Sequence, residues 1–411
     1  MSSNFWLIIA TTLGTILEWA EFVCYGYLAS KISKLFFDVH QKYALILTFA
    51  VFAVSYLARP IGAGILGYVG DCYGRRVALF TSIIGMGIAT LGIAVTPTYQ
   101  EIGVLATIIL ILCRLIQGMS IAGEFTGAAI FIAEHNHKEN KNLAISWVSC
   151  SSALGMALGA ALASIVSIAN MPEWSWRIPF FIGFIGCLTG LLLRGLVQES
   201  PEFYNKIVIN NNNSFKQFRQ GLLHTILSLR ISLLKSFLIA SFIGVYILIC
   251  NLWWTSYVFQ QHYFSEHDSH LLSFLGVMMA VVLTPTVAYI VDRCKIVPRK
   301  IMKIGLLLSV LSAPLMFWIP MQFPGFWFGF IVQLIYALNN VLVASVMFTY
   351  LSELFPVQIR YFALGISWNL AVAIFGGTAP LVAQLLLTNT NSVLYIAGYV
   401  ALFGAIAGLI I

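Results

Sequence analysis

The chain has 411 residues, of which 60% are hydrophobic and only 9% are charged, too few charges to cover a water-soluble protein of this size. A membrane-spanning helix needs about 20 mostly apolar residues, so the chain can hold about twelve spans joined by short loops. Open sheets are excluded, because lipid leaves the backbone groups at a sheet edge without partners. The net charge of +7 does not indicate nucleic-acid binding, since the basic residues are scattered through short polar breaks.

Apolar runs between these breaks predict twelve spanning helices in chain order. They lie near residues 5–30, 43–68, 77–96, 102–133, 143–169, 176–197, 236–259, 271–291, 300–319, 325–350, 361–387 and 392–411. The first run follows no basic leader or cleavage site, so we expect it to be a retained span. The longest polar break separates two sets of six spans. We therefore expect an all-α membrane protein with two pseudo-symmetric six-helix bundles, 1–198 and 236–411, joined by a cytoplasmic linker loop, 199–235.

The basic residues also predict an orientation. With the N-terminus in the cytoplasm, sixteen of the 22 Lys and Arg residues, Arg194 among them, fall in cytoplasmic breaks and four on the opposite side. We expect a multi-pass protein of a bacterial inner (plasma) membrane with both termini in the cytoplasm. The seven cysteines show no Cys-x-x-Cys pair, so neither a disulfide framework nor a metal site is expected.

A charged motif follows the second span, Gly67-Tyr-Val-Gly-Asp71-Cys-Tyr-Gly-Arg75-Arg76. Its glycines allow a tight turn, Asp71 can accept hydrogen bonds from helix N-termini, and the arginines can pair with acids of neighbouring helices. A weaker echo follows the eighth span, and the fourth and tenth spans each end in an acid followed by bases. We expect a cytoplasmic gate formed by Asp71, Arg75, Arg76, Glu134, Asp292, Glu353 and Arg360. The alternative is an ordinary positively charged loop.

This motif resembles the signature loop of the major facilitator superfamily at every fixed position. Further segments are similar to the metabolite:proton symporters of that superfamily: Glu18-Trp-Ala-Glu21-Phe, Arg59-Pro60-Ile-Gly62, Arg114-Leu-Ile-Gln117-Gly118, Gly123-Glu124, Trp176-Arg177-Ile-Pro179-Phe180, Glu199-Ser-Pro201 and Phe355-Pro356-x-x-x-Arg360. Two stretches, 124–134 and 355–364, look most like the proline/betaine branch.

The resemblance implies the major facilitator fold and import of a small polar organic solute, a proline/betaine-like zwitterion or an organic acid, by proton symport. No cofactor beyond the coupling proton and no enzymatic activity are expected. The chain departs from the family pattern at Glu21, where aspartate is usual, and at Arg114, where proline/betaine carriers have lysine. It ends at Ile411, so we expect no cytoplasmic coiled-coil tail and no osmotic gating through one.

Ionisable residues within the spans of the first half are functional candidates, because a charge in the membrane is costly unless it faces water or a partner. Glu18 and Glu21 share one face of the first helix. The resemblance implies that Glu21 pairs with Arg114 of the fourth span and releases it on protonation, as a proton-coupling pair. A static salt bridge is the alternative.

The predicted solute site combines charges of the first half with amides and aromatics of the second, which suits a small zwitterion or carboxylate. Its residues are Glu18, Arg59, Gln117, Glu124, Trp253, Trp254, Asn339, Asn340 and Asn369. Glu18 and Glu124 could instead serve structural hydrogen bonding, and Arg59 could brace the bundle. The two tryptophans could stack on a cation or belong to an interfacial belt.

Three classes of function compete: proton-coupled importer, drug or metabolite efflux antiporter, and non-transporting receptor or enzyme. The fifth span has Ser152-Ala-Leu-Gly155-Met-Ala-Leu-Gly159, without the proline of the antiporter signature. No nucleophile, base or metal cluster indicates an enzyme. We expect a functional monomer whose partners are a small solute and membrane lipids.

Overall fold

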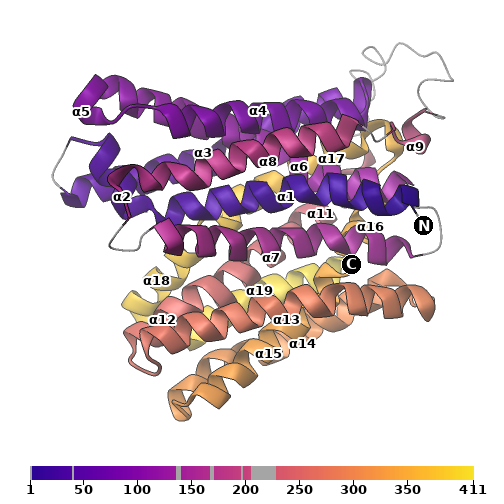
Figure 1. Ribbon diagram of the computed structural model, residues 1–411. Coiled ribbons are helices and arrows are strands. Elements are labelled where there is room, and N and C mark those ends of the chain that lie inside the picture. The colour runs from indigo at the N-terminus through magenta and orange to yellow at the C-terminus, as the bar shows by residue number, and fades with distance from the viewer. Residues whose placement is uncertain (1, 39–40, 136–139, 167–170, 196–197, 205–227) are drawn as a thin grey trace. The chain divides into compact units, whose positions relative to one another are not determined.

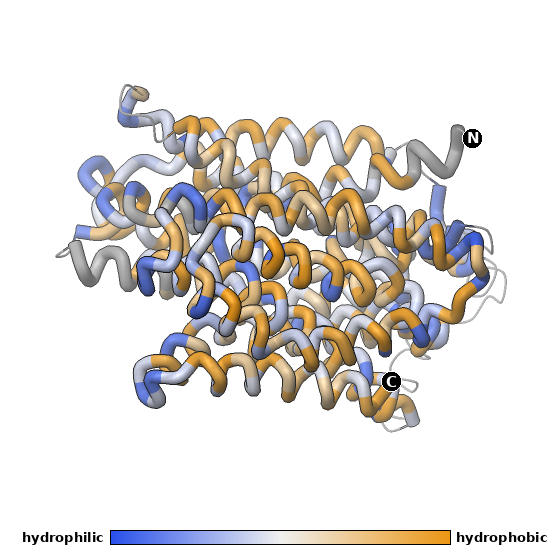
Figure 2. The backbone as a smooth tube through the Cα atoms, turned by 90° about the horizontal axis from the view of Figure 1, so that it is seen from below, coloured by the Kyte–Doolittle hydropathy of each residue, from blue (hydrophilic) through white to orange (hydrophobic). Residues whose placement is uncertain are grey.

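The computed structural model describes residues 2–411 apart from 39–40, 136–139, 167–170, 196–197 and 205–227. Within these residues the regular structure is helical and contains no strand. Among the described residues, ten helical segments are long and apolar enough to cross a membrane by length and composition. The first and last predicted spans correspond to α1 (Ser2–Tyr27) and α19 (Leu394–Ile410). Figure 2 shows hydrophobic residues along the central stretches of the helices and hydrophilic residues gathered towards their ends.

The helices form two compact units, labelled by element in Figure 1. Unit 1 comprises Met1–His135, Ser151–Gly221 and Pro356–Asn369. Its elements are α1, α2 (Ala29–Phe36), α3 (Gln41–Cys72), α4 (Arg75–Val95), α5 (Tyr99–Ile102), α6 (Val104–His135), the second part of α7 (Lys141–Val166), η1 (Glu173–Arg177), α8 (Ile178–Gly195), α9 (Pro201–Phe203), η4 (Val357–Ile359) and most of α17 (Arg360–Ala371).

Unit 2 comprises Asn136–Cys150, Leu222–Phe355 and Leu370–Ile411. It holds the start of α7 and the end of α17. Its other elements are α11 (Arg230–Ile247), η3 (Leu248–Trp253), α12 (Trp254–Gln260), α13 (Glu266–Arg293), α14 (Pro298–Gln322), α15 (Phe326–Ala344), α16 (Met347–Glu353), η5 (Val372–Gly376), α18 (Ala379–Thr390) and α19. The division into 1–198 and 236–411 stays a prediction, and most of the predicted linker lies outside the described residues.

The helix boundaries differ from the predicted spans in three ways. The seventh span begins at Arg230 rather than near 236. The seventh and eleventh spans each contain a π-helical segment, η3 and η5, which apolar periodicity cannot detect because it adds a single residue to a turn. The first span ends at Tyr27, and α2 follows as a separate short helix.

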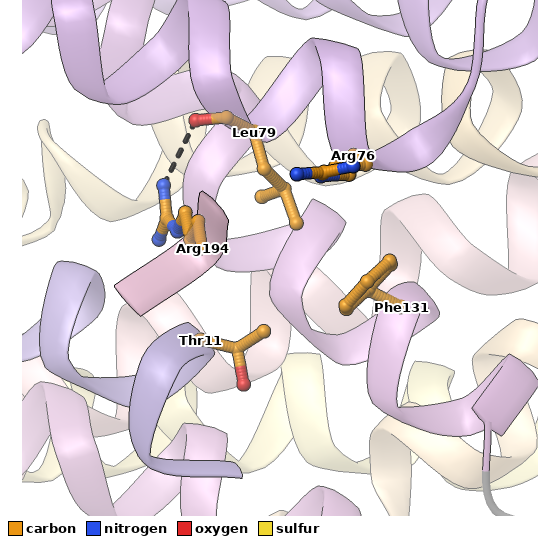
Figure 3. Close-up of a pocket in the computed structure, with 5 residues that line it drawn as sticks. All are labelled: Thr11, Arg76, Leu79, Phe131 and Arg194. Atoms are coloured by element: carbon orange, nitrogen blue, oxygen red, sulfur yellow. Dashed lines mark hydrogen bonds between the residues drawn. The ribbon is translucent and has the colours of Figure 1, made fainter. Parts of the chain in front are cut away.

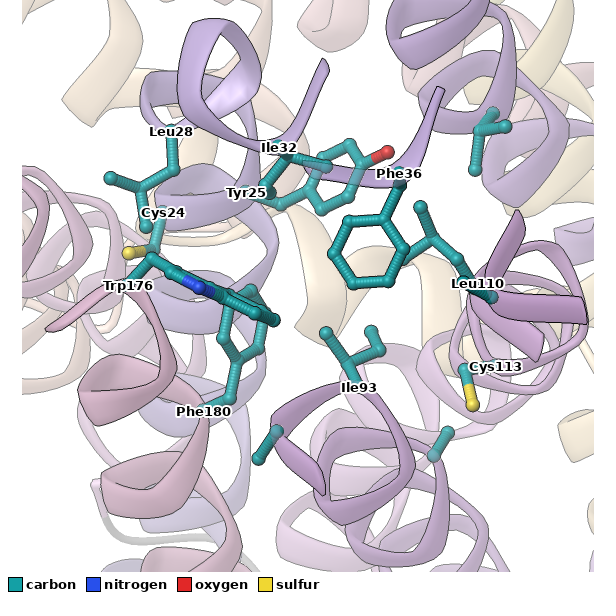
Figure 4. Close-up of a cluster of buried hydrophobic side chains, with 14 of the residues drawn as sticks. Cys24, Tyr25, Leu28, Ile32, Phe36, Ile93, Leu110, Cys113, Trp176 and Phe180 are labelled. Atoms are coloured by element: carbon teal, nitrogen blue, oxygen red, sulfur yellow. The ribbon is translucent and has the colours of Figure 1, made fainter. Parts of the chain in front are cut away.

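Helix α2 is held by an aromatic cluster at one end of unit 1. Ile32 and Phe36 are fully buried, and Figure 4 shows them beside Tyr25, Ile93 and Trp176. The Phe36 and Trp176 rings meet edge to face with centroids 5.5 Å apart, a favoured aromatic geometry. This cluster joins α1, α2, α3, α4, α6, α7, η1 and α8.

Glycines let α3 and α6 approach backbone to backbone. A Cβ atom added at Gly62 would overlap the backbone of Met119, and one added at Gly118 would overlap the backbone of Ser55. Small residues permit this close packing of membrane helices, which lack a hydrophobic drive towards each other in lipid. The contact matters for function because α6 carries the polar residues described below.

We expect Gly62→Ala to lower the thermal unfolding temperature of the purified protein, because overpacking a tight contact costs about 1–3 kcal/mol. Gly64→Ala on the same helix is the control, since a Cβ at Gly64 meets nothing within 4 Å. That control should match or exceed the wild-type temperature, because alanine is favoured over glycine in a helix interior by about 1 kcal/mol. Equal losses in both variants would show that the α3–α6 approach does not limit stability.

Candidate functional site

Arg75 is fully buried at the start of α4, directly after Gly74, whose φ of 118° turns the chain out of α3. Its guanidinium donates to Glu134 of α6 through Nε at 3.1 Å and Nη2 at 3.2 Å. It also donates to Asp71 at 3.0 Å and to the carbonyl of Val357. Buried charges persist when pairing and hydrogen bonds are this complete.

Asp71 caps the start of α17. Its carboxylate accepts the backbone N–H groups of Tyr361 at 3.1 Å and Phe362 at 2.8 Å, which belong to the first turn of the helix and have no partner within it. The Tyr361 hydroxyl donates to the carbonyl of Gly123 at 2.5 Å, and a Cβ at Gly127 would overlap this hydroxyl. The contact is the one the sequence predicted for Asp71, whereas a gating role stays a prediction.

The segment Glu199-Ser200 completes this network, although only its family resemblance marks it in the sequence. The Glu199 carboxylate accepts the backbone N–H groups of Arg75 and Arg76, each at 3.1 Å. The Ser200 hydroxyl donates to Glu134. The N-terminus of α4 is therefore capped by an acid from beyond the end of α8.

Arg360 adds a second cation to the network. Its Nη1 donates to Glu134 and to Glu202, both at 3.0 Å. Arg76 differs from the other predicted gate residues of unit 1, because its side chain donates to the carbonyl of Gly195 at 2.7 Å. We refer to the connected residues as the Arg75 cluster: Asp71, Arg75, Glu134, Glu199, Ser200 and Arg360.

Unit 2 contains a smaller counterpart. Asp292, at the end of α13, accepts from the side chain of Asn142 at 2.8 Å and from the next backbone N–H at 2.8 Å. It thereby caps α7 as Asp71 caps α17. Lys141 and Glu353 form an ion pair at 2.8 Å, and the Glu353 side chain is 57% exposed, so the pair contributes at most about 1 kcal/mol.

Glu21 lies buried on α1 between two neutral hydrogen-bond donors. Thr90 of α4 and Gln117 of α6 both donate to its carboxylate, and Gln117 Nε2 also lies 3.2 Å from Thr90 Oγ1. Arg114 donates through Nη1 to Gln117 Oε1 at 2.7 Å. Among the described side chains there is no direct Glu21–Arg114 ion pair, so the two predicted partners are joined through an amide.

The guanidinium of Arg114 lies against aromatic faces. Its guanidinium carbon lies 3.7 Å from the centroid of the Tyr25 ring and 5.5 Å from that of Phe22, within cation–π range. Its Nε and Nη2 atoms are buried without a hydrogen-bond partner among the described residues. A buried guanidinium with idle donors is poised to bind a further acceptor.

Glu18 and Arg59 are also incompletely paired. Glu18 is 3% exposed, yet neither carboxylate oxygen has a partner within the described ranges. The same holds for the hydroxyl of Thr15, the indole N–H of Trp19 and the Nε of Arg59, whose guanidinium carbon lies 5.8 Å from the Trp19 ring centroid. We refer to these groups as the unpaired patch: Thr15, Glu18, Trp19, Arg59 and the idle side of Arg114.

Glu124, by contrast, is fully engaged. Both terminal nitrogens of Arg194 donate to its carboxylate, Nη1 at 3.0 Å, and the Ser82 hydroxyl donates at 3.1 Å. A Cβ at Gly14 would overlap this pair, so α1 passes directly over it. Figure 3 shows Arg194 donating to the carbonyl of Leu79 beside a small cavity.

The assignment of Arg194 to a cytoplasmic break is wrong, because the residue is 3% exposed within α8. A signal was present in the sequence. Arg194 lies inside the predicted span 176–197, and Glu124 in the fourth span requires a buried cation. Counting basic residues by loop takes neither of these two signals into account.

Several buried amides of unit 2, the predicted Asn339 among them, form hydrogen bonds with their own neighbours. Asn339 donates to the Ser312 hydroxyl at 2.7 Å, and Asn251 lies 3.4 Å from Gln333 Oε1. The Oδ1 of Asn340 is buried without a partner in the part of the chain that the structure describes. Asn340 is therefore the predicted amide with spare capacity for a ligand.

The two tryptophans of unit 2 face inwards. Trp253 stacks on Tyr257 with centroids 5.1 Å apart and donates to Gln384 at 3.2 Å. Trp254 is fully buried and donates to the carbonyl of Met316 at 3.0 Å, which excludes an interfacial belt for this residue. In unit 1, Asn369 donates to the carbonyl of Ala122 at 3.0 Å.

Comparison with known sequences identifies the family to which the chain belongs. Residues 5–366 match the family model of the Major Facilitator Superfamily. The chain is 31% identical to the "Proline/betaine transporter" of Escherichia coli (strain K12) over 98% of this chain and 81% of the relative. It is also 31% identical to the "Glycine betaine/proline/ectoine/pipecolic acid transporter OusA" of Dickeya dadantii, over 98% and 81% of the two chains.

Solved structures agree at the level of the fold. The proton:xylose symporter XylE bound to 6-bromo-6-deoxy-D-glucose superposes with a TM-score of 0.79 at 19% identity, covering 99% of this chain and 95% of the other. The human organic anion transporter MFSD10 gives a TM-score of 0.74 at 14% identity and covers 100% of both chains. The predicted fold class is confirmed.

We expect Arg194→Met to destabilise the protein strongly, because removing one partner of a buried pair costs about 3–5 kcal/mol. Glu124→Met/Arg194→Met should recover most of the thermal unfolding temperature, since apolar side chains of similar volume tolerate the same site. Arg76→Met is the control, because its hydrogen bond to a carbonyl is exposed. A double variant as unstable as Arg194→Met would mean that the ion pair itself, rather than the orphaned acid, decides stability.

Proposed function

The chain belongs to the major facilitator superfamily, and from this premise we propose that it imports a small zwitterion by proton symport across a bacterial inner membrane. As a member of this family it is a multi-pass membrane transporter of small solutes rather than an enzyme. The proposal adds the solute class, the coupling ion, and a functional monomer with both termini in the cytoplasm.

The unpaired patch is the observation that carries the solute class. It holds a carboxylate without a hydrogen-bond partner, on Glu18, which interacts electrostatically with Arg59. Arg59 and Arg114 each have unpartnered donors and lie over the same Phe22 ring. Leaving buried polar groups unsatisfied costs about 1–3 kcal/mol each, and more when they are charged. A zwitterion supplies both missing partners, because its carboxylate can bind a guanidinium and its ammonium can bind Glu18.

The aromatic rings of unit 1 support recognition of the solute carboxylate by arginine. Arg59 lies 4.4 Å from the Tyr56 ring centroid and 4.9 Å from that of Phe22, so the protein's own cation already occupies these faces. The rings hold the guanidinium from one side and leave its edge available for a ligand. The relatives named above transport proline, betaine, ectoine or pipecolic acid, all of which carry a carboxylate and a cationic nitrogen group.

Glu21 is the proposed proton carrier. It is buried at 3% exposure and accepts from neutral donors, so it can be protonated without breaking a direct ion pair. Glu124 is less suited to this role, because Arg194 and Ser82 already hold it as a brace. The Arg75 cluster, with Asp292 and Glu353 in unit 2, is proposed as the cytoplasmic gate that stabilises one state of the transport cycle.

Glu18→Gln should discriminate between solutes. Proline has N–H donors for the Glu18 carboxylate, whereas glycine betaine has none. Losing one charge-assisted hydrogen bond costs about 1.5–3 kcal/mol, so the apparent proline Kd should rise about 10- to 100-fold. The betaine Kd should change much less, and the exposed Glu101→Gln control should change neither. Equal effects on both solutes, measured by binding to purified protein, would remove Glu18 from recognition of the ammonium.

Glu21→Gln should separate two activities in proteoliposomes. An inward proton gradient should drive wild-type accumulation of labelled proline or betaine, in preference to citrate or 2-oxoglutarate. The variant mimics permanent protonation, so it cannot discharge a proton and should lose accumulation. Solute exchange needs no discharge and should persist. Retained gradient-driven accumulation in Glu21→Gln would remove this residue from coupling, and pH-driven extrusion of a hydrophobic dye in place of uptake would contradict the importer assignment.

A further inference from the structure

We propose that Gln117 is a positioning residue that transmits the protonation of Glu21 to Arg114 by rotating its side-chain amide. The inference rests on the proposed proton coupling at Glu21. It assigns the transmission to a neutral residue that the sequence predicts in the solute site.

The hydrogen bonds around Gln117 run in one direction. Arg114 Nη1 donates to Gln117 Oε1 at 2.7 Å, and Gln117 Nε2 donates to Glu21 Oε1. Every donor faces an acceptor in this chain, and Glu21 accepts on both oxygens, from Gln117 and from Thr90, as an ionised carboxylate does. The arrangement therefore describes the deprotonated state of Glu21.

A proton on Glu21 Oε1 reverses this requirement. The new O–H group would face the Nε2 amide nitrogen, which is also a donor. Rotation of the amide by half a turn brings Gln117 Oε1 to accept from Glu21, but it turns Nε2 towards Arg114. Two donors then face each other, and the Arg114–Gln117 hydrogen bond is lost. The proton comes from water on the outer side and later leaves to water on the inner side, with no other covalent bond changed.

Released from Gln117, Arg114 has spare capacity on all its donors. Its Nε and Nη2 are already unpartnered among the described residues, and its remaining contacts are aromatic faces such as Tyr25. An anionic acceptor then becomes its best partner, and the solute carboxylate supplies one. Protonation thus favours solute binding, which is the order that symport requires.

Other groups near Glu21 bear on this scheme. Thr90 of α4 donates to Oε2, and a proton on that oxygen could be accepted by the hydroxyl without moving Gln117. The titratable or charged neighbours are Glu18 and Cys24 of α1, Cys113 and Arg114 of α6, and Cys187 of α8. Thiols ordinarily titrate near pH 8.5, so Glu18 is the neighbour whose protonation must be separated from that of Glu21 in the test.

The test compares Gln117→Met with Gln333→Met, measured as solute affinity against pH in purified protein and as transport in proteoliposomes. Gln333 is a buried glutamine of unit 2 that contacts Asn251 rather than a charged group. If the wild-type Kd changes at least about tenfold between pH 6 and pH 8, that change should fall below about twofold in Gln117→Met. Gradient-driven accumulation should fall with it, while exchange persists. Gln333→Met and Glu18→Gln should each keep a pH-dependent affinity.

The outcomes separate the relay from the function on which it rests. If Glu21→Gln uncouples transport while Gln117→Met keeps both pH-dependent affinity and accumulation, the relay is overturned and the proton symport stands. If Glu21→Gln keeps accumulation, the proposed coupling at Glu21 fails whatever Gln117→Met does.

Thr90→Val provides a second test, because it removes the alternative proton acceptor. Loss of pH-dependent affinity in Thr90→Val but not in Gln117→Met would place the relay on Thr90 instead.

Discussion

Burial of charge in a low-dielectric interior is the constraint on which the arrangement of unit 1 depends, because each buried ion must find a partner or remain costly. The charges meet this constraint to different degrees. Glu124 and Arg194 satisfy each other directly, and Glu21 and Arg114 are joined through the amide of Gln117. Glu18 has no hydrogen-bond partner among the described residues. A fully hydrogen-bonded ion pair loses contacts if it moves, whereas a charge with unpartnered atoms gains hydrogen bonds when a ligand binds. The degree of pairing therefore distinguishes charges that brace the helices from charges that can bind a solute or a proton.

The same constraint applies to the Arg75 cluster, which is proposed as the gate. Arg75 is shared by Asp71 and Glu134 with no exposed surface on any of the three side chains. Glu134 in turn binds Arg360, and Asp71 caps the helix that Arg360 begins. Removing one member would leave the other charges buried without an opposite charge. Such a network is therefore stable when all its ion pairs are formed or when water hydrates all its charges, and unstable when only some of the pairs are formed. That property suits the proposed gate, because a transporter that rocks between states needs contacts that break together.

The sequence predicted the helices and the motif residues more successfully than it predicted which side chains meet. Length and hydropathy locate spans, because lipid demands long apolar helices whatever their neighbours are. Partners across helices depend on rotation and depth, which a single sequence does not encode in its periodicity. The sequence therefore predicts a loop position for Arg194, although the residue pairs with Glu124. Only the family resemblance marks Glu199 and Ser200. For the same reason the sequence does not predict the amide between Glu21 and Arg114. Their residue types indicate a direct ion pair, whereas in the structure the side chain of Gln117 lies between them.

The two departures from the family pattern make physical sense together. The sequence has glutamate at position 21, where aspartate is usual in the resembling family, and arginine at position 114, where lysine is found in its proline/betaine branch. The longer carboxylate reaches two neutral donors on separate helices, Thr90 and Gln117. A guanidinium can donate from one nitrogen to Gln117 while its other edge stays free for a ligand, whereas an ammonium is a single compact donor centre without this division. The proposed relay requires both the longer acid and the guanidinium. Glu21 must hydrogen-bond to the neutral amide of Gln117, and Arg114 must bind first that amide and then the solute. In the proposed relay, the residues at 21 and 114 therefore act together.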